Sequence, residues 1–365
     1  MKRTRIVFAG GFLGAGKTTL LWEAARRLIN KGVRTGLITN DQAPGLVDTA
    51  LLQRQGLKVA EVCGSCFCCN FGGLTDAIGS IGAEVEADVI IAEPVGSCTD
   101  LSATILQPLK QYMSRELAVA PFSALADPER LESVLRGDTA GLHADAAYIF
   151  RKQLEESDII VVAKSDTLDA GALASLLERT REAFPASTVM AVSAVSGHGV
   201  DEWTDLVLKR TDAGRRIVQV DYDVYAHGEA VLGWLNATVQ LKGKAADWDA
   251  FTRDFLSQLA QRFDGKKYAV GHVKAILEHE DRYIVGNLTG RAHTLSLRNS
   301  AGTGDTARLT VNARVETSPE TLDALVRETL ADATRDRCES TPLAWRCLQP
   351  GRPNPTHRFT QVVGA

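Results

Sequence analysis

The octapeptide Gly11-Phe-Leu-Gly-Ala-Gly-Lys-Thr18 constrains the fold more than any other feature of the sequence. It matches the pattern GxxxxGK[ST] and lies between a β-rich run, Arg5 to Gly10, and a stretch with helical apolar spacing, Lys17 to Lys31. In this context the glycines let backbone N–H groups turn toward phosphate oxygens, and the start of the helix adds positive partial charge. The sequence therefore predicts a strand, a phosphate-binding loop and a helix that together bind a nucleoside triphosphate.

The residue types in this loop have separate expected tasks. We expect Lys17 to reach the β- and γ-phosphates and the hydroxyl group of Thr18 to hold Mg²⁺. The residues expected to surround the phosphates are Gly11, Gly14, Ala15, Gly16, Lys17, Thr18 and Thr19.

Two acidic residues stand at the ends of apolar runs that we interpret as strands. Asp41 follows the run TGLIT, and Glu93 ends the run DVIIAE. Either carboxylate could coordinate Mg²⁺ or orient the attacking water, or it could only cap the next helix. Gly96 would let a backbone N–H group approach the γ-phosphate and sense its hydrolysis. The candidate catalytic residues are therefore Lys17, Asp41 and Glu93.

The alternation of apolar runs with helical stretches predicts an α/β fold with a mostly parallel sheet covered by helices. After residue 216 the order becomes β-α-β-β-α, which is typical of a smaller α+β domain with an antiparallel sheet. Prolines among basic residues predict an extended tail or a strap at the end. The expected divisions are 1–215, 216–345 and 346–365.

The overall composition narrows the possible partners and the cellular location. The net charge of −4 is spread along the chain without a basic stripe, so nucleic acid is not the expected partner. The N-terminal stretch lacks the pattern of a signal peptide, and there is no long uncharged apolar run. We therefore expect a cytoplasmic protein without a membrane span, where clustered cysteines more often bind metal than form disulfides.

A short motif after the DIIVVA run predicts which base is bound. The carboxylate of Asp166 can accept hydrogen bonds from the N1–H and 2-amino groups of guanine, and adenine lacks this pair of donors. We expect Lys164 to lie over the base and ribose and the backbone at Ala194 to contact the guanine O6. Ser193, which precedes Ala194, is also expected at the base site. The motif KxD is short, and its chance occurrence in a surface turn is the alternative.

The stretch EVCGSCFCC holds four cysteines, Cys63, Cys66, Cys68 and Cys69, beside Glu61. Thiolates suit Zn²⁺, Co²⁺ and Cu(I), and Glu61, Asp41 or a histidine could add a transient ligand. An iron–sulfur cluster, a redox disulfide and purely structural cysteines remain alternatives. Of the other three cysteines, Cys98 lies just past Gly96 and could belong to the core, which is the favoured interpretation, or lie near the nucleotide.

With GFLGAGKTTLL, NDQAPGLVD, EVCGSCFCC, EPVG and AKSD in this order, the chain resembles the CobW-like GTPases, which are related to UreG and HypB. The resemblance implies a P-loop GTPase domain that binds a transition metal at a CxCC motif, followed by a variable C-terminal domain. It further implies that GTP hydrolysis controls delivery of the metal, zinc or cobalt, to a client protein. Homodimer formation is a further possibility.

Three residues depart from the pattern of that family. Asp41 stands where the family usually has Glu, Gly64-Ser65 replaces the usual Asn-Gly, and Ala163 stands where Asn is expected in the guanine motif. The last change removes a side chain that steadies the loop, although Asp166 is present.

Two other functions remain open on the sequence alone. One is a nucleotide-dependent remodelling chaperone for a cobalamin-linked enzyme, in which the cysteines are secondary. The other is a P-loop kinase that phosphorylates a small molecule, in which Asp166 would be incidental. Slow basal hydrolysis is expected for the GTPase because no arginine finger can be assigned from the sequence.

Overall fold

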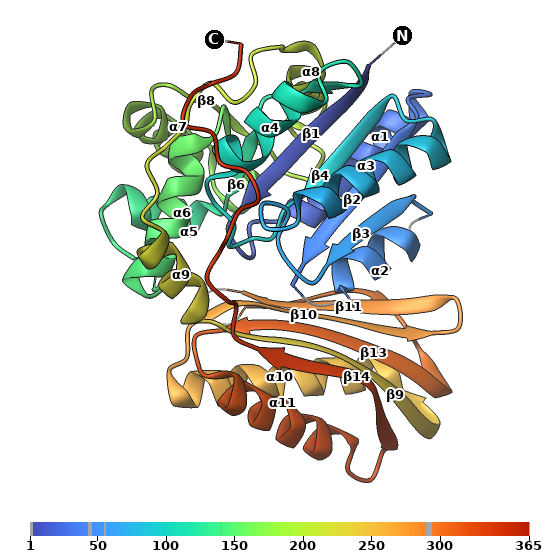
Figure 1. Ribbon diagram of the computed structural model, residues 1–365. Coiled ribbons are helices and arrows are strands. Elements are labelled where there is room, and N and C mark those ends of the chain that lie inside the picture. Colours follow the sequence, from blue (N-terminus) through green and yellow to red (C-terminus); the bar gives the residue numbers. More distant parts are fainter. Residues whose placement is uncertain (1–2, 43–45, 55, 140, 290–293, 365) are drawn as a thin grey trace.

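Two separate β-sheets organise the chain in the computed structural model (Figure 1), which describes residues 3–42, 46–54, 56–139, 141–289 and 294–364. The first sheet has the strand order β3-β2-β4-β1-β6-β7-β8, with β5 also paired to β1, and its pairings are parallel. Its strands are β1 (Thr4–Gly11), β2 (Thr35–Asp41), β3 (Val59–Cys63), β4 (Val89–Glu93), β5 (Leu117–Val119), β6 (Ser123–Ala126), β7 (Ile159–Val162) and β8 (Thr188–Ala191).

Helices cover both faces of this sheet, because alternate strand residues belong to two different cores. Ile6 and Phe8 of β1 pack in one core with α3 and α6, and Val7 and Ala9 pack in the other with α1 and α8. The helices are α1 (Lys17–Asn30), α2 (Val47–Arg54), α3 (Phe71–Val85), α4 (Gln107–Tyr112), α5 (Pro128–Leu135), α6 (Ala144–Glu156), α7 (Ala170–Ala183), α8 (Val200–Lys209) and α9 (Tyr222–Ala230).

The second sheet is antiparallel, with the order β12-β11-β10-β13-β9-β14. Helices α10 and α11 pack on one face, and the other face lies toward the first sheet (Figure 1). The elements are β9 (Gly233–Asp247), α10 (Trp248–Lys266), β10 (Val270–His279), β11 (Arg282–Thr289), β12 (Thr294–Ser300), β13 (Thr303–Val315), α11 (Pro319–Thr334) and β14 (Cys338–Leu348).

The predicted fold class is confirmed: a mostly parallel, helix-covered sheet precedes a smaller α+β unit. The pattern analysis missed the short strands β3, β5 and β6 and half of the second sheet. Strand β14 runs to Leu348, so it includes the first residues assigned to an extended tail. Helix α9 follows residue 215, yet Tyr225 packs in a core of the first sheet.

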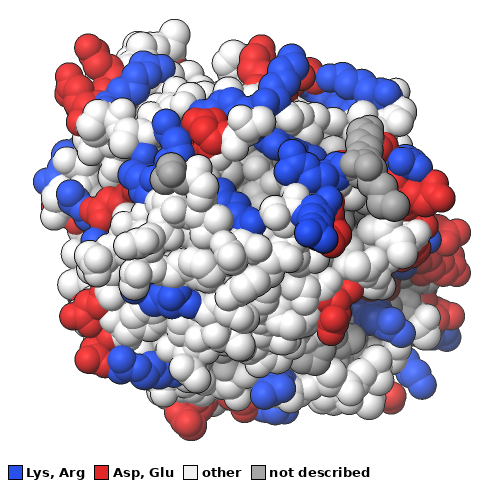
Figure 2. All heavy atoms as spheres, turned by 45° about the horizontal axis from the view of Figure 1, so that its top comes forward, with Lys and Arg blue, Asp and Glu red and all other residues white. Residues whose placement is uncertain are grey.

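The surface and the helices give two further observations. On the face in Figure 2, basic and acidic side chains are interspersed around a broad area of uncharged residues. Within the part of the chain that the structure describes, no helix has the length and apolar character needed to cross a membrane.

Helix α6 holds the loop that follows β4. The side-chain amide of Gln153 donates to the carbonyl groups of Gly96 and Cys98, at 2.9 and 2.8 Å. Glu156 accepts hydrogen bonds from the hydroxyl group of Thr99 (3.0 Å) and the backbone N–H of Ser102 (2.9 Å). These contacts fix the path of the chain just beyond Glu93, one of the predicted site residues.

Burial of the Glu156 carboxyl group should make the stability of the fold depend on pH. Burial raises the pKa of Glu156 from 4.5 to about 8. Between these values the unfolded chain releases the proton first, so folding stability falls as pH rises from about 4.5 to about 8, by at most about 5 kcal/mol. We expect Glu156→Gln to lose less stability than the wild type between pH 5 and 8 in urea titrations. An identical pH profile in both proteins would contradict this origin.

Candidate functional site

The loop between β1 and α1 has the backbone of a phosphate cradle. Gly14 and Gly16 have φ values of 78° and 90°, which residues that carry a Cβ atom rarely adopt. No side chain caps the N-terminus of α1, so its first N–H groups remain available to an anion. The ammonium group of Lys17 donates to the carbonyl oxygen of Gly11 at 2.9 Å. The loop is thus arranged around the position of a phosphate group.

Two cavities adjoin this loop. A cavity of about 550 Å³ contains the side chains expected at the γ-phosphate, and a cavity of about 1010 Å³ contains those expected at the base. The first is lined by the predicted residues Gly14, Gly16, Lys17, Thr18, Thr19, Asp41, Glu93, Gly96 and Lys164, and the second by Gly14, Ala15, Gly16, Thr19, Lys164, Asp166 and Ala194. We call them the phosphate cavity and the base cavity.

Two of the residues predicted to contact the nucleotide line neither cavity. Gly11 packs against β6, where an added Cβ would lie 2.2 Å from the carbonyl oxygen of Leu125. Ser193 is fully buried, and its hydroxyl oxygen accepts a hydrogen bond from the backbone N–H of Ser196 at 3.0 Å. Both residues therefore lie outside the cavity linings and help to maintain the shape of the site.

Carboxylate and hydroxyl oxygens converge at the start of α1. The hydroxyl group of Thr18 donates to Glu93, with oxygen separations of 3.0 and 3.2 Å, and Lys17 lies 3.9 Å from the same carboxylate. Burial, together with the negative charge of Asp48, raises the pKa of Glu93 to about 7. Burial also lowers the pKa of Lys17, although Glu93 opposes this effect. This group of charges is poorly solvated and hence responsive to an added ion.

The sequence analysis missed two charged residues of this group, Asp48 and Lys274. Lys274 of β10 is ion-paired to Asp48 at 2.6 Å and lies 3.5 Å from the hydroxyl oxygen of Thr18. Burial favours a neutral Asp48, but Lys274 acts with Thr18 and Lys17 against this effect, and together they lower the pKa of that carboxyl group. Asp48 ends the segment NDQAPGLVD, whose residues 43–45 lie outside the described residues, and Lys274 comes from the second sheet. No pattern in the sequence gave either residue a role in the site.

Asp41 has a different partner from the one its strand-end position suggested. It is ion-paired at 2.6 Å to Arg314 of β13, whose guanidinium group also lies 4.2 Å from the centre of the Trp234 ring. Asp41 lines the phosphate cavity, yet Glu93 and Asp48 are the carboxylates beside Thr18. Two carboxylates and a hydroxyl group are hard oxygen donors of the kind Mg²⁺ prefers, so the residues present fit this ion.

The base cavity contains a carboxylate that is free to bind a ligand. Asp166 is exposed, lines the cavity and has no hydrogen-bond partner among the described residues. The neighbouring Lys164 has a φ of 52° and is ion-paired to Asp127 at 2.8 Å, a residue that the motif search did not include. Asp127 thus steadies the loop in which Ala163 offers no polar side chain.

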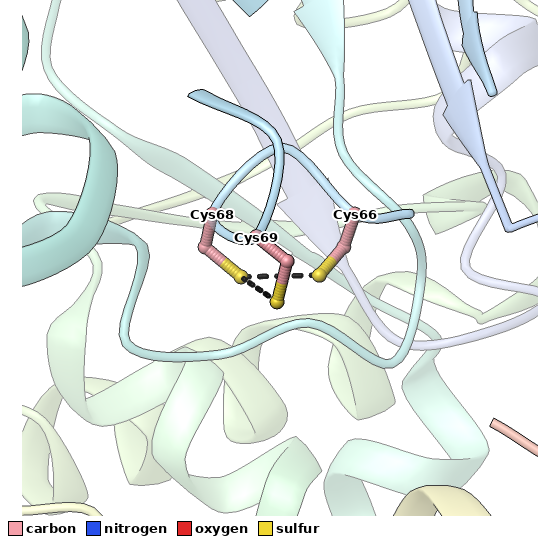
Figure 3. A group of neighbouring side chains, drawn as sticks. All are labelled: Cys66, Cys68 and Cys69. Atoms are coloured by element: carbon pink, nitrogen blue, oxygen red, sulfur yellow. Dashed lines mark hydrogen bonds between the residues drawn. The ribbon is translucent and has the colours of Figure 1, made fainter. Parts of the chain in front are cut away.

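Three of the four clustered cysteines, Cys66, Cys68 and Cys69, come together in residues 64–70 between β3 and α3, which we call the cysteine loop (Figure 3). The sulfur atoms of Cys66 and Cys68 are 3.1 Å apart, and those of Cys68 and Cys69 are 3.8 Å apart. Hydrogen bonds from the surrounding thiols lower the pKa of Cys66, which favours a thiolate there. Cys63 points elsewhere: its exposed thiol donates to the carboxylate of Glu61 at 3.2 Å.

Asn40 connects the cysteine loop to the phosphate cavity. Its side-chain amide donates to the carbonyl oxygens of Val62 and Ser65, each at 2.9 Å, and accepts from the backbone N–H of Phe67 at 2.9 Å. Asn40 also lines the phosphate cavity, next to Asp41. The buried side chain of Asn40 therefore holds the cysteine loop at the edge of the nucleotide site.

Residues 349–364, which we call the strap, run over the cysteine loop and continue along the first sheet unit (Figure 1). The backbone N–H of Asn354 donates to the sulfur of Cys69 at 3.2 Å, and that of Thr356 donates to the carbonyl oxygen of Cys68 at 2.9 Å. Further along, Arg358 is ion-paired to Asp100 at 2.6 Å. The predicted extended end of the chain thus covers the cysteine site.

Comparison with known proteins gives a family match over the first sheet. The model for "CobW/HypB/UreG, nucleotide-binding domain" matches residues 5–191. A zinc chaperone CobW from Pseudomonas aeruginosa is 27% identical over 222 residues, which cover 53% of this chain and 56% of that protein. The chain thus spans little more than half the length of this curated relative.

Solved structures give weaker likenesses. HypB from Helicobacter pylori in complex with nickel is 16% identical, with 60% of this chain and 92% of that chain covered and a TM-score of 0.42. The Zn(II)-bound YjiA GTPase from E. coli is also 16% identical, with 91% and 99% covered and a TM-score of 0.36. At these values the two structures carry no argument about function.

Removing one partner of the ion pair between Asp48 and Lys274 should destabilise the fold. Both side chains are largely buried, so Lys274→Met leaves an uncompensated carboxylate, and we expect a loss of about 3 kcal/mol in urea titration. The double variant Asp48→Asn, Lys274→Met should recover most of that loss. Additive effects of the two substitutions would show that the pair does not act as a unit.

Removal of the strap should expose the cysteine loop. A chain that ends at Leu348 should react at least tenfold faster with a thiol reagent at Cys68 and Cys69 than the full chain does, because protection of partly buried groups depends on the cover above them. Cys63, already exposed, provides the internal control and should react at the same rate in both. Mass spectrometry of the labelled peptides separates the sites. Unchanged labelling of Cys69 would show that the strap does not protect it.

Proposed function

The chain belongs to the CobW/HypB/UreG nucleotide-binding domain family, and from this premise we propose that it is a GTP-hydrolysing metallochaperone. Zinc or cobalt is its cargo, the cysteine group is its loading site, and a client metalloprotein is the recipient. The proposal includes a cytoplasmic location and allows a homodimer.

The proposal rests on the link between the three cysteines and the phosphate cavity. Two segments, the end of β2 and the loop after β4, connect Cys66, Cys68 and Cys69 to that cavity. Asn40 holds the cysteine loop from the end of β2. Glu93 ends β4, and Val95 in the loop that follows packs in one core with Cys66 and Cys68. In the same loop, an added Cβ at Gly96 would lie 3.0 Å from the ammonium nitrogen of Lys17. A γ-phosphate beside Lys17 would therefore press on segments that also position the cysteines.

The phosphate cavity supplies the groups that phosphoryl transfer needs. Lys17 binds the β- and γ-phosphate oxygens, and backbone N–H groups of the loop stabilise the charge that develops in the transition state. Thr18, Glu93 and Asp48 would hold Mg²⁺, which neutralises phosphate charge when bound. Lys274 and Arg314 bring two further cations from the second sheet to the same cavity, and Asp41 is oriented by Arg314.

The base cavity supports guanine as the bound base. The free carboxylate of Asp166 can accept the two hydrogen bonds that guanine donates, and Lys164 lies beside it at the junction of both cavities. Adenine would leave this carboxylate without a partner, which is the basis on which such a site discriminates.

The remodelling chaperone is the second candidate, because the strap and the second sheet offer surfaces beyond the nucleotide site. That function predicts unchanged nucleotide-dependent partner binding after Cys66, Cys68 and Cys69 are replaced by serine. A small-molecule kinase has less support, since a kinase has no need for a thiol group tied to the phosphate cavity.

Hydrolysis should depend on Lys17 and on the guanine base. We expect Lys17→Ala to lower kcat/KM for GTP by a factor of about 100 or more, measured as phosphate release, because it removes a donor to the developing charge. Lys31→Ala, at the far end of the same helix and exposed, is the matched control and should retain activity. Faster hydrolysis of ATP than of GTP would contradict the role given to Asp166.

Metal binding should depend on both the thiols and the nucleotide. In anaerobic Zn²⁺ titrations, we expect the Cys66/Cys68/Cys69→Ser triple variant to lose the tight site. In the wild type, Mg²⁺ with a non-hydrolysable GTP analogue should shift the affinity by about fivefold or more. Absence of thiolate-dependent binding in every nucleotide state would overturn the metallochaperone and favour the remodelling chaperone.

A further inference from the structure

A second group of metal-binding side chains lies outside the cysteine loop, on two neighbouring helices. His143 and Asp145 stand at the start of α6, His227 stands on α9, and one ligand atom of each lies within 4.8 Å of those of the other two. Nδ1 of His227 is 2.5 Å from Oδ2 of Asp145, and Nδ1 of His143 is 3.7 Å from the same oxygen. Two imidazole nitrogens thus converge on one carboxylate oxygen.

These separations are close to those of a tetrahedral metal site. Zn²⁺ binds imidazole nitrogen and carboxylate oxygen at about 2.0–2.2 Å, so two of its ligand atoms stand about 3.4 Å apart. Nδ1 of His143 is already near this distance from Asp145, and Nδ1 of His227 would have to move away by about 1 Å. The side chain of His227 is 58% exposed, so it has room for this adjustment.

The fold fixes the backbone that carries the three side chains. Helices α6 and α9 lie side by side (Figure 1), and an added Cβ at Gly228 would be 2.4 Å from the carbonyl oxygen of Asp145. The backbone N–H of His143 donates to Glu316, which follows β13, at 3.1 Å. The position of each ligand therefore depends on packed helices and on a contact with the second sheet unit.

Helix capping explains only part of this arrangement. His143 is the N-cap of α6, and its Nδ1 accepts a hydrogen bond from the backbone N–H of Asp145 at 3.2 Å. An ion bound through Nδ1 would replace this long hydrogen bond, and the first N–H groups of a helix can bond to water instead. A cap does not require a second imidazole at the same carboxylate, yet α9 supplies one in His227.

The donor atoms indicate the class of ion. Imidazole nitrogen suits Zn²⁺, Ni²⁺ and Cu²⁺, and Zn²⁺ also accepts a carboxylate oxygen. This group contains no sulfur, so it lacks the soft ligands that select Cu(I). The side chains of His143, Asp145 and His227 are all partly exposed, so water or a ligand from another molecule can complete the coordination.

We propose that His143, Asp145 and His227 form a second metal site, for a divalent cation that prefers imidazole nitrogen, with Zn²⁺ as the reference ion. Each imidazole binds as a neutral ring, and a proton held between His227 and Asp145 leaves to solvent when the ion binds. The site contains no cysteine, so the inference does not depend on the proposed function.

An ion at this site would join two helices that both hold the loop after β4. Gln153 of α6 donates to the carbonyl oxygen of Gly96 at 2.9 Å, and Glu229 of α9 accepts from the hydroxyl group of Ser97. A metal ion that ties α6 to α9 would therefore restrain both supports of the segment that contacts Lys17.

The test is a Zn²⁺ titration of the full chain in the triple cysteine-to-serine variant, whose thiol site cannot mask a weaker one, at about pH 7.5, where imidazole is mostly neutral. In this background, His143→Asn and His227→Gln are the test variants, and asparagine retains an N-cap acceptor for α6. His198→Gln, exposed in the loop before α8, is the matched control. We expect each test variant to bind Zn²⁺ more weakly by at least about tenfold, and the control to match its background.

A second measurement uses the wild type and does not depend on how any variant folds. Diethyl pyrocarbonate modifies accessible histidines, and mass spectrometry locates the modified residues. Added Zn²⁺ should slow the modification of His143 and His227 and leave that of His198 unchanged. Unchanged rates at all three residues would refute the site.

The outcomes separate this inference from the metallochaperone. Absence of Zn²⁺ binding in the triple variant, or equal affinity in His143→Asn, His227→Gln and their background, overturns the histidine site and leaves the metallochaperone intact. An equal loss in His198→Gln would show that surface histidines bind Zn²⁺ without a defined site, which also overturns it. Zn²⁺ binding that needs the histidines but never the thiols would instead overturn the metallochaperone and keep this site.

Discussion

The side-chain amide of Asn40 is the interaction on which the arrangement of both sites depends. It bonds to one carbonyl group of β3 and to two backbone groups of the cysteine loop, and Asn40 itself lies next to the last residue of β2, at the edge of the phosphate cavity. A buried amide with all these bonds made has little freedom, and loss of any one would leave a polar group without a partner. Asn40 therefore contacts both the cysteine loop and the phosphate cavity. A change of conformation at the nucleotide site can reach the three cysteines through this one residue.

The second sheet takes part in the nucleotide site through charge. Lys274 and Arg314 neutralise Asp48 and Asp41, so the cavity already contains paired charges before any anion enters. A triphosphate with Mg²⁺ would compete for these same partners. The energy of nucleotide binding is thus linked to how the two sheets sit against each other, because the cations come from one and the carboxylates from the other.

The sequence was most informative where function depends on neighbours along the chain. The phosphate loop, the Lys164–Asp166 turn and the Cys66–Cys69 group are each encoded within a few residues, and the structure brings most of their side chains to the two cavities and the thiol group. Asp48 and Lys274 were not identified as site residues because their roles depend on contacts between elements far apart in the sequence. Strands as short as β5 carry too few residues for periodicity to identify them.

The strap follows every other described element in the chain, and this order has a consequence for biosynthesis. While a ribosome makes the protein, the cysteine loop and the loop after β4 can assemble long before residues 349–364 emerge. The backbone of Asn354 can contact the sulfur of Cys69 only afterwards. On the proposed function, a metal ion that arrives during synthesis would meet a cysteine loop without this cover, whereas one that arrives later would meet Cys69 with the strap above it.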